Sequence, residues 1–484
     1  HSFPTRRSSD LKLAKAGKKV LILEQHNKPG GFSTNFKRKG YIFDVSLHNF
    51  GSIYDNPSLL NIFNELNLFK DLKFIPFDEY QRVIFPDDDI LIKKGIDAFI
   101  NELVKRYPEE KKGIEKLFET IKSLKKEFDE IEKLNISMDK LITEYPLLPI
   151  KFPLLVKLAE KSFDNLLCEY IKNEKLKGIV GFNWQICGLP PNRVASILYS
   201  IPTTNLIEHS GGYIEGSSQK LSDILSQKIV DNNGVILTNT KVEKIIVENN
   251  KVCKVVIKNQ HEYYSEIVIS NISPQTSYRL AGISEKKSDK MENSLSAVQL
   301  YLGLDINPDK LGIKNHNLTV FYDYDHGINY QKIVEGDYEK TFFSATNYTN
   351  IDSSLIPQGK GILTVMSLDH IKNWEDLSQE EYLKKKNEVS KIIIKKIEKY
   401  YKNISDHIVV SELATPVTMK RYTLHPEGAI YGFSQNIKQS GVNRFSQRSK
   451  IEGLFFTGSN VYPGAGYCSV MTAGALLSEK ILKL

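Results

Sequence analysis

The fold is decided by the stretch Val20-Leu21-Ile22-Leu23-Glu24 and, five residues after its acid, Pro29-Gly30-Gly31. A continuous apolar run that ends in an acid predicts a buried strand of a parallel sheet. In a dinucleotide-binding βαβ unit, an acid at the end of the second strand accepts hydrogen bonds from the adenosine ribose. The phosphate-binding glycine motif of such a unit lies about 20 residues before that acid. Residues 1–16 contain no glycine, so the sequence predicts that the chain begins with half of a nucleotide site.

The first eleven residues read HSFPTRRSSDL, a segment that is basic and rich in serine. Transit peptides have this composition, and twin-arginine export signals contain such an arginine pair, although no apolar segment follows it here. A translated sequencing adapter fused to a truncated gene fits better. We therefore expect residues 1–11 to be an artefactual leader and the native sequence to begin near Lys12. Residues 13–17 would then end the first helix, with Gly17 as its stop signal.

Bulk composition indicates a globular protein. The 484 residues are 41% hydrophobic and 25% charged, which suits two or three folded domains. No apolar run approaches the ~18 residues of a transmembrane helix. The net charge of +7 comes from 65 basic and 58 acidic residues that are spread along the chain. This pattern favours a solvated lysine-rich surface over a nucleic-acid site, with attraction to anionic lipid as the alternative.

The cysteines indicate neither a metal site nor a disulfide framework. Cys168, Cys187, Cys253 and Cys468 form no C-x-x-C pair, so no zinc site is predicted. Unpaired thiols are typical of a reducing compartment, and we therefore expect a cytoplasmic protein, with association to a membrane left open.

The middle of the chain alternates strand and helix patterns. Residues 40–44 form a short apolar run, and Asn56-Pro57 begins a helix, with the asparagine as its cap. Residues 114–134 carry apolar side chains at steps of three and four, which predicts a long amphipathic helix. A helix over 221–229 and a strand over 234–237 follow.

Residues 241–270 predict three strands with short turns. The first strand begins at Val242, the second covers 252–257 and the third covers 267–269. Asn249-Asn250 is the residue pair that a tight hairpin turn needs.

Residues 145–155 read YPLLPIKFPLL. Three prolines argue against a regular helix. The segment is apolar apart from Lys151. It is therefore either a buried loop or a patch that dips into a membrane surface.

The C-terminal end of the chain contains a second group of residues that is typical of a ligand site. Residues 454–456 predict a buried strand, and Gly458, Gly464 and Gly466 precede a helix that begins at about Ser469. Glycines let backbone amides approach a ligand closely, and a helix N-terminus favours anionic groups.

Taken together, these segments resemble the phytoene desaturase, carotenoid isomerase and retinol saturase group of FAD-dependent oxidoreductases. The resemblance runs from about residue 12 to the end, and it is carried by residues 16–31, 40–48, 416–432 and 453–474. It implies an α/β fold: a discontinuous FAD-binding Rossmann-like domain, whose first strand and glycine motif are missing, and an α+β substrate domain. The expected FAD domain comprises residues 12–75, 213–290 and 411–484. The expected substrate domain, with a helical insert, comprises residues 76–212 and 291–410.

The resemblance also implies how the cofactor is held. FAD binds non-covalently and extended in that family. Glu24 would hold the adenosine ribose, Gly30 and Gly31 would lie against the pyrophosphate and ribityl, and Val242 would contact the adenine through its backbone. The ribityl and flavin end would be lined by Gly458, Ser459, Pro463, Gly464 and Gly466. Two positions depart from the family pattern: Ser459 replaces a frequent aspartate, and Gly216-Ser217 replaces a glycine pair.

The implied chemistry is desaturation, saturation or flavin-assisted isomerisation of C–C and C=C bonds in a long, apolar polyene or isoprenoid. No Ser-His-Asp set, paired carboxylates or metal cluster is apparent, so no acid or base is assigned. His48 and Tyr467 are weak candidates for a catalytic role. Two alternatives stay open: an amine-oxidase-like flavoenzyme, and a non-enzymatic prenyl-lipid escort of the same fold.

Overall fold

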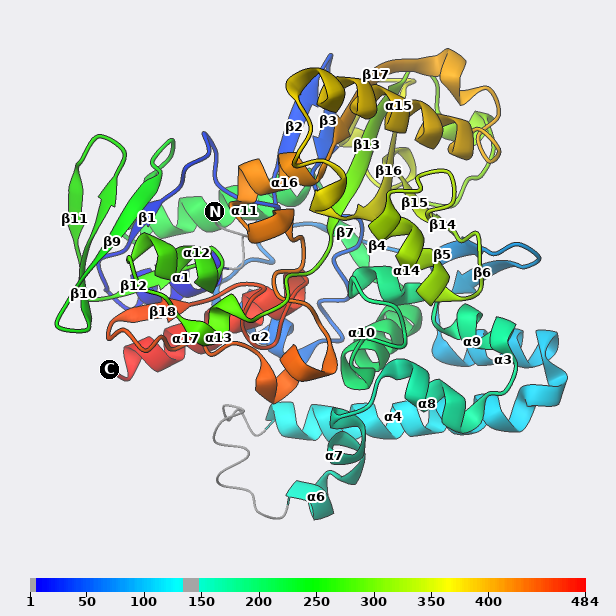
Figure 1. Cartoon of the computed structure of the whole chain (residues 1–484), viewed down its shortest axis with the longest axis horizontal. Helices are drawn as coiled ribbons and strands as arrows, with labels where there is room; N and C mark the ends of the chain where they lie inside the picture. The colour runs from blue at the N-terminus through cyan, green and yellow to red at the C-terminus, as the bar shows by residue number, and fades with distance from the viewer. Residues whose placement is uncertain (1–5, 134–147) are drawn as a thin grey trace.

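A computed structural model describes residues 6–133 and 148–484 of the chain. Figure 1 shows three regions: the two ends of the chain and a small meander at the left, a large sheet at the upper right, and a group of helices below that sheet. The region at the left contains parts of the three segments that were expected to form the FAD domain. The division of the chain into two domains stays a prediction.

Four short strands form the parallel pairs of the left region. β1 (Leu21–Leu23) pairs with β8 (Val235–Leu237), and β12 (Val268–Ser270) pairs with β18 (Leu454–Phe456). Each pair joins segments about 200 residues apart, so the predicted discontinuity is present. Among the described residues the two pairs are separate sheets rather than one Rossmann-like sheet. That finer detail, and the missing first strand, stay predictions.

Helices cover these strands. Three of them pack together: α1 (Arg6–Lys15), α11 (Ser218–Asp231) and α17 (Tyr467–Leu482). Part of the expected artefactual leader lies within α1. Residues 8–11 are buried in α1, Leu11 is fully buried, and Ser8 Oγ donates to Met471 O at 2.9 Å. The foreign origin of this segment stays a prediction. The helix ends before Gly17, whose φ of 79° confirms the predicted stop.

The meander consists of β9 (Val242–Glu248), β10 (Lys251–Ile257) and β11 (Glu262–Tyr264). Its first two strands confirm the prediction, and Asn249 and Asn250 have φ of 49° and 61°, as a tight hairpin turn requires. The predicted third strand forms as β12, but it pairs with β18 and is not part of the meander. Residues 268–269 belong to β12, because this apolar segment is drawn to the buried β18 while the more exposed β11 completes the meander.

A seven-stranded sheet forms the upper right region, in the order β17-β13-β16-β15-β14-β5-β6. Only β14 and β5 are parallel neighbours. Its strands are β5 (Glu79–Ile84), β6 (Asp89–Lys93), β13 (Ser296–Leu304), β14 (Asn317–Val320), β15 (Phe343–Asn347), β16 (Gly361–Asp369) and β17 (Ile408–Ala414). β17 contains residues on both sides of position 410, where the expected substrate domain ends and the expected FAD domain resumes.

The two faces of this sheet differ in composition. The outer face carries Val298, Leu300, Leu363 and Val365, which pack against α15 (Gln379–Ile397). On the inner face, the same strands carry Gln299, Thr319, Thr346 and Thr364. These side chains are also buried and lie among apolar ones on the same face, such as Ile362, so the inner face encloses polar groups without exposing them.

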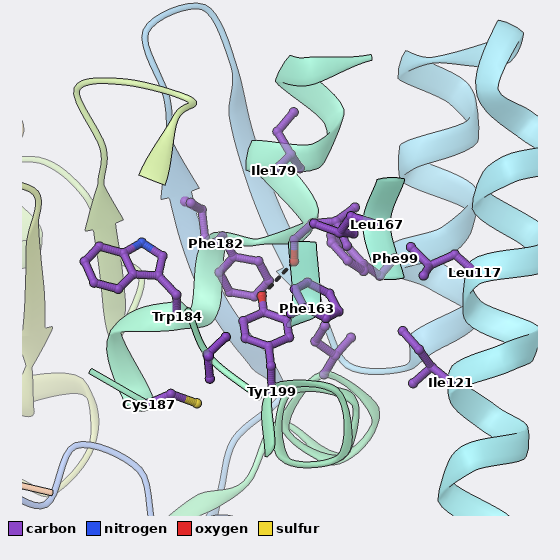
Figure 2. Close-up of a cluster of buried hydrophobic side chains, with 14 of the residues drawn as sticks. Phe99, Leu117, Ile121, Phe163, Leu167, Ile179, Phe182, Trp184, Cys187 and Tyr199 are labelled. Carbon is purple, nitrogen blue, oxygen red and sulfur yellow. Dashed lines mark hydrogen bonds between the residues drawn. The ribbon is translucent and has the colours of Figure 1, made fainter. Parts of the chain in front are cut away.

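Helices pack in the lower region, with the side chains shown in Figure 2 at their centre. Tyr199 stacks on Phe163 with ring centroids 3.9 Å apart, and its hydroxyl donates to Val180 O at 2.7 Å. The helices are α3 (Ile96–Arg106), α4 (Lys111–Lys133), α8 (Phe163–Tyr170), α9 (Glu174–Val180) and α10 (Ser196–His209). α4 confirms the predicted amphipathic helix.

The proline-rich segment contains two short helices, α6 (Leu148–Lys151) and α7 (Pro153–Ala159), so the expectation of no helix was wrong. Pro153 occupies the first position of α7, where a missing N–H costs no hydrogen bond. Phe152 is buried whereas Ile150 is 77% exposed, and residues 145–147 lie outside the described part. No helix among the described residues is long and apolar enough to cross a membrane.

The remaining elements connect these regions. Asn56 caps α2 (Pro57–Glu65) by accepting from Leu59 N at 3.0 Å, as predicted. The others are β2 (Asn35–Arg38), β3 (Tyr41–Asp44), β4 (Phe74–Pro76), β7 (Gly212–Ile214), α12 (Pro274–Leu280), α13 (Lys286–Asp289), α14 (His326–Glu335) and α16 (Pro416–Thr423).

Candidate functional site

The N-terminal half of the predicted nucleotide site begins at Glu24, directly after β1. Its backbone continues the β1–β8 pairing by donating to Leu237 O at 2.9 Å. The buried carboxylate accepts from His26 N at 2.9 Å, which fixes the turn that leads toward Gly30. The structure thus places the acid at the end of the strand. Its contact with a ribose stays a prediction.

Gly30 and Gly31 form a turn that packs on α11, with φ of 141° and 60°. A Cβ atom on Gly30 would lie 2.1 Å from Ser33 O, so only glycine fits there. Two serines of α11 secure the turn: Ser222 Oγ donates to Ser33 O at 2.8 Å, and Ser218 O accepts from Ser33 Oγ at 2.9 Å. The glycine at position 30 is therefore required by the packing of the chain on itself.

Asp44, at the end of β3, holds this turn in place and was not among the predicted site residues. Its buried carboxylate accepts from Tyr213 Oη at 2.9 Å, from Ser218 N at 2.6 Å and from Leu47 N at 3.0 Å. Burial raises the pKa of Asp44, and these donors oppose the rise. Asp44 thereby joins β3, β7 and the start of α11. An acid that ends an apolar run was the available signal.

The C-terminal half of the site is the turn between β18 and α17, residues 457–466. A Cβ on Gly458 would lie 2.3 Å from Asn271 Oδ1, and one on Gly464 would lie 2.8 Å from Gln435 Nε2. Gly466 differs, because no atom lies within 4 Å of its Cβ position. Gly466 therefore leaves open space before the N-terminus of α17, and its φ of 97° is the reason that the chain uses glycine there.

Several buried polar atoms around this turn lack a hydrogen-bond partner within the described chain. Buried polar groups are almost always paired, so a cluster of such atoms indicates a ligand. The ribityl hydroxyls and ring heteroatoms of a flavin dinucleotide are suitable partners. The atoms are Gln435 Oε1, Arg444 Nε, Thr457 Oγ1, Ser459 Oγ and Asn460 Nδ2.

His48 faces the polar inner face of the sheet. Its Nδ1 lies 3.0 Å from Thr346 Oγ1 and 3.1 Å from Tyr348 Oη. Tyr348 donates its hydroxyl proton to Leu47 O. Thr346 donates its own to Asn317 Oδ1. With the Asn317 amide oriented so that its Oδ1 accepts, both protons are committed, which places the proton of the ring on Nδ1 and leaves the lone pair on Nε2. Burial lowers the pKa of His48 to about 4, so the ring is neutral at pH 7.

Tyr467 is the first residue of α17, and a local hydrogen-bond chain fixes it. Ser46 Oγ donates to Phe32 O at 2.9 Å, so the Tyr467 hydroxyl, 3.0 Å away, donates to Ser46 Oγ. Its ring contacts Phe50 with centroids 5.4 Å apart. Burial, together with Asp44, raises the pKa of Tyr467. A partly buried neutral tyrosine is a poor base, so the structure favours a positioning role for it.

The remaining predicted residues are dispersed. Val242 begins β9 and is half-buried opposite Ile257, and Pro463 precedes Gly464 in the C-terminal turn. The roles of all predicted site residues toward FAD stay predictions. No cluster of His, Cys, Asp or Glu in the described part of the chain could hold a metal ion.

Comparison with known proteins identifies the class. A family model described as flavin containing amine oxidoreductase matches residues 11–478. The chain belongs to this family and is an FAD-dependent enzyme. The polar atoms without partners and the open space at Gly466 fit such a cofactor.

Three curated relatives cover nearly the whole chain. Prolycopene isomerase 1 of Oncidium hybrid cultivar is 26% identical over 97% of this chain and 80% of its own length. All-trans-retinol 13,14-reductase of Danio rerio is 24% identical over 98% and 84%. A 4,4'-diapophytoene desaturase of Staphylococcus aureus is 24% identical over 99% and 97%. These relatives confirm the resemblance drawn from the sequence motifs.

Solved structures share the fold at lower identity. Putrescine oxidase bound to putrescine superposes with a TM-score of 0.65 at 13% identity, over 100% of this chain and 97% of that one. Rab GDI from Plasmodium falciparum gives a TM-score of 0.52 at 12% identity, over 98% and 95%. An amine oxidase and a GDI thus share one fold, so the fold alone does not select a substrate.

Proposed function

We propose that this enzyme acts on C–C or C=C bonds of a long, apolar polyene or isoprenoid, by desaturation, saturation or isomerisation. The observation that carries the proposal is the set of curated relatives. An isomerase of prolycopene, a reductase of retinol and a desaturase of diapophytoene each match 97% or more of this chain. Bound FAD would supply the redox chemistry by exchanging a hydride with a substrate carbon.

The chain would hold the cofactor at the two turns described above. We assign Glu24 to the ribose, the turn at Gly30 and Gly31 to the pyrophosphate side, and Val242 to the adenine. The turn from Gly458 to Gly466 would hold the ribityl and flavin end. Support comes from the buried unpartnered atoms, which gather at the second turn.

The inner face of the sheet would orient the substrate. His48 is neutral at pH 7, so its Nε2 lone pair can accept a hydrogen bond, and the ring does not act as a fixed cation. Apolar and aromatic side chains form the core of the neighbouring helical region, and their packing excludes water from it. This environment suits a polyene, which offers few polar groups.

A lipophilic substrate has to be taken from a membrane or a carrier, and α6–α7 is the surface that we assign to membrane contact. Ile150 is 77% exposed and Val156 is 40% exposed, with Lys151 beside them. The segment is anchored to α4, because Glu127 accepts from Leu154 N and Leu155 N at 3.2 Å and 2.9 Å. An apolar surface flanked by lysine suits an anionic bilayer.

The membrane contact is tested with Ile150→Asp combined with Val156→Asp. Co-sedimentation with vesicles that contain anionic lipid should fall at least tenfold, because each charge opposes burial in the acyl region. The thermal midpoint should not change, since both side chains are exposed. Leu383→Asp is the matched control, as Leu383 is 49% exposed on α15 at another surface. Equal losses in the two proteins would argue against a specific membrane surface.

The reaction is tested by anaerobic mixing of the flavin-loaded protein with prolycopene, all-trans-retinol or diapophytoene. A desaturation substrate should bleach the flavin absorbance. A saturation substrate should restore the absorbance of dithionite-reduced enzyme. An isomerisation should change the polyene spectrum without net flavin reduction. Bleaching by putrescine but by no polyene would establish the amine-oxidase alternative. A protein that holds no flavin and turns nothing over would favour the prenyl-lipid escort.

A further inference from the structure

Arg444 is a buried arginine in the C-terminal turn. Only 4% of its surface is exposed. Its Nη1 donates to Phe433 O at 2.9 Å and to Ser434 O at 3.0 Å. Its Nη2 donates to Ser459 O and reaches Tyr431 O at 3.5 Å. The guanidinium therefore sits between residues 431–434 and the turn that follows Gly458.

The partners of Arg444 are all neutral carbonyl oxygens. No carboxylate in the described part of the chain forms an ion pair with it. Glu292, on the neighbouring segment, is bound instead to Arg193 at 2.6 Å and to Asn436 at 3.0 Å. Carbonyl oxygens satisfy the donors of a guanidinium but do not balance its charge. A buried charge without a counter-charge is costly, and proteins normally pair such groups or use them.

Burial lowers the pKa of Arg444 to about 9, so the group still carries its charge at pH 7. Its Nε has no partner in the described chain, and the same is true of Ser459 Oγ and Asn460 Nδ2. These atoms belong to one turn, because Arg444 bonds directly to the carbonyl of Ser459. A positive charge and a set of unused polar atoms thus meet where the flavin end of the cofactor is expected.

We propose that Arg444 is the electrostatic partner of the FAD isoalloxazine and stabilises its reduced, anionic form. The inference rests on the proposed position of FAD and not on the identity of the substrate. Hydride transfer brings two electrons and one proton to the oxidised flavin, so the ring gains one negative charge. A fixed cation in a dry site favours that charged state. Arg444 would thereby raise the reduction potential and favour hydride acceptance.

The first test uses the wild-type protein loaded with FAD. Its midpoint potential is measured between pH 5 and pH 6 by dye equilibration, a range in which free reduced flavin keeps its N1 proton and takes up two protons with two electrons. Two electrons with one proton change the reduction equilibrium tenfold per pH unit, which is about 30 mV for a two-electron couple. Two protons would give a hundredfold change, or about 59 mV. The proposal predicts the smaller slope, and the larger slope would overturn it.

The second test compares three variants as holoproteins. Arg444→Met removes the charge and keeps most of the volume, so the reduced form should lose at least tenfold in affinity relative to the oxidised form. Arg444→Lys keeps the charge, and its potential should stay close to that of the wild type even if its thermal midpoint falls. Arg448→Met is the matched control, because Arg448 is exposed four residues further along. It should not change the potential.

A purely structural role makes different predictions. If Arg444 only joins residues 431–434 to Ser459, Arg444→Met should weaken oxidised and reduced FAD equally and leave the potential unchanged. That outcome would overturn the proposal. If Arg444→Met retains no FAD, Arg444→Lys decides: a tenfold or larger loss of preference for the reduced form, with the charge present, would also overturn it. Polyene turnover is measured separately, so failure here leaves the proposed function intact.

Discussion

The two faces of the seven-stranded sheet are built from the same strands and are both buried, yet they differ in chemistry. The outer face is apolar and packs against α15. The inner face carries Gln299, Thr319, Thr346 and Thr364 and lies toward His48. Because successive residues of a strand point to opposite faces, Thr364 and Val365 are neighbours in sequence but belong to different environments.

The comparison teaches that burial serves two purposes in this molecule. On the outer face it provides the free energy of folding through apolar contact. On the inner face, Gln299 Nε2 and Thr364 Oγ1 have no partner in the described chain. Leaving polar atoms unpaired costs stability, so the inner face is organised for something other than folding. We infer that it serves the substrate side of the site.

Among the changes considered, Val365→Thr has the largest expected effect on the free energy of unfolding at pH 7. It places a hydroxyl in the apolar outer face, where Val365 is fully buried. The free energy of unfolding should fall by about 2 kcal/mol, as for a buried hydroxyl without a partner. Urea unfolding measures the change, and FAD content should be unaffected. A cost near zero would mean that the outer face contains an acceptor and is not purely apolar.

The next effect concerns His48 and the pH dependence of stability. Its pKa in the folded protein is about 4, below the ordinary value of 6.5. The neutral ring therefore contributes its full stability above pH 6.5, and this contribution is lost as the pH falls from 6.5 to 4. The slope is at most about 1.4 kcal/mol per pH unit.

The His48 prediction is checked by urea unfolding at pH 7, 6 and 5 for the wild type and for His48→Gln. Other buried histidines, such as His326, titrate in the same range, so the difference between the two proteins isolates His48. The variant should lose less stability at low pH. Parallel curves would show that the inner face lets the ring become protonated without cost.

Much of the fold was predictable because local patterns determine it. The run Val20–Glu24, the cap at Asn56 and the periodicity of α4 each depend on neighbours in sequence, and each prediction was confirmed. Residues 267–269 were misassigned because their pattern specifies a buried strand but not its partner. β18 lies almost 200 residues away, and no local signal identifies it.

The candidate site was predictable only in part, for a similar reason. Glycine positions and the family resemblance located the turns at residues 30–31 and 458–466. Asp44 was missed although it ends an apolar run, because that signal does not identify its partners, and the contacts of Arg444 arise from atoms that come together only on folding. The inner face was also missed: a polar residue within a strand normally indicates exposure, whereas Thr364 is buried.

Thr364→Val has the smallest expected effect. It is the reciprocal of Val365→Thr, and it tests whether the inner face is functional. Thr364 is 1% exposed and its hydroxyl has no partner in the described chain. Removing the hydroxyl at nearly constant volume should leave the free energy of unfolding unchanged or raise it by about 1 kcal/mol. If the hydroxyl serves the substrate, turnover should fall while stability does not. A loss of stability with unchanged turnover would show that Thr364 has a structural role. The two faces would then differ in composition but not in purpose.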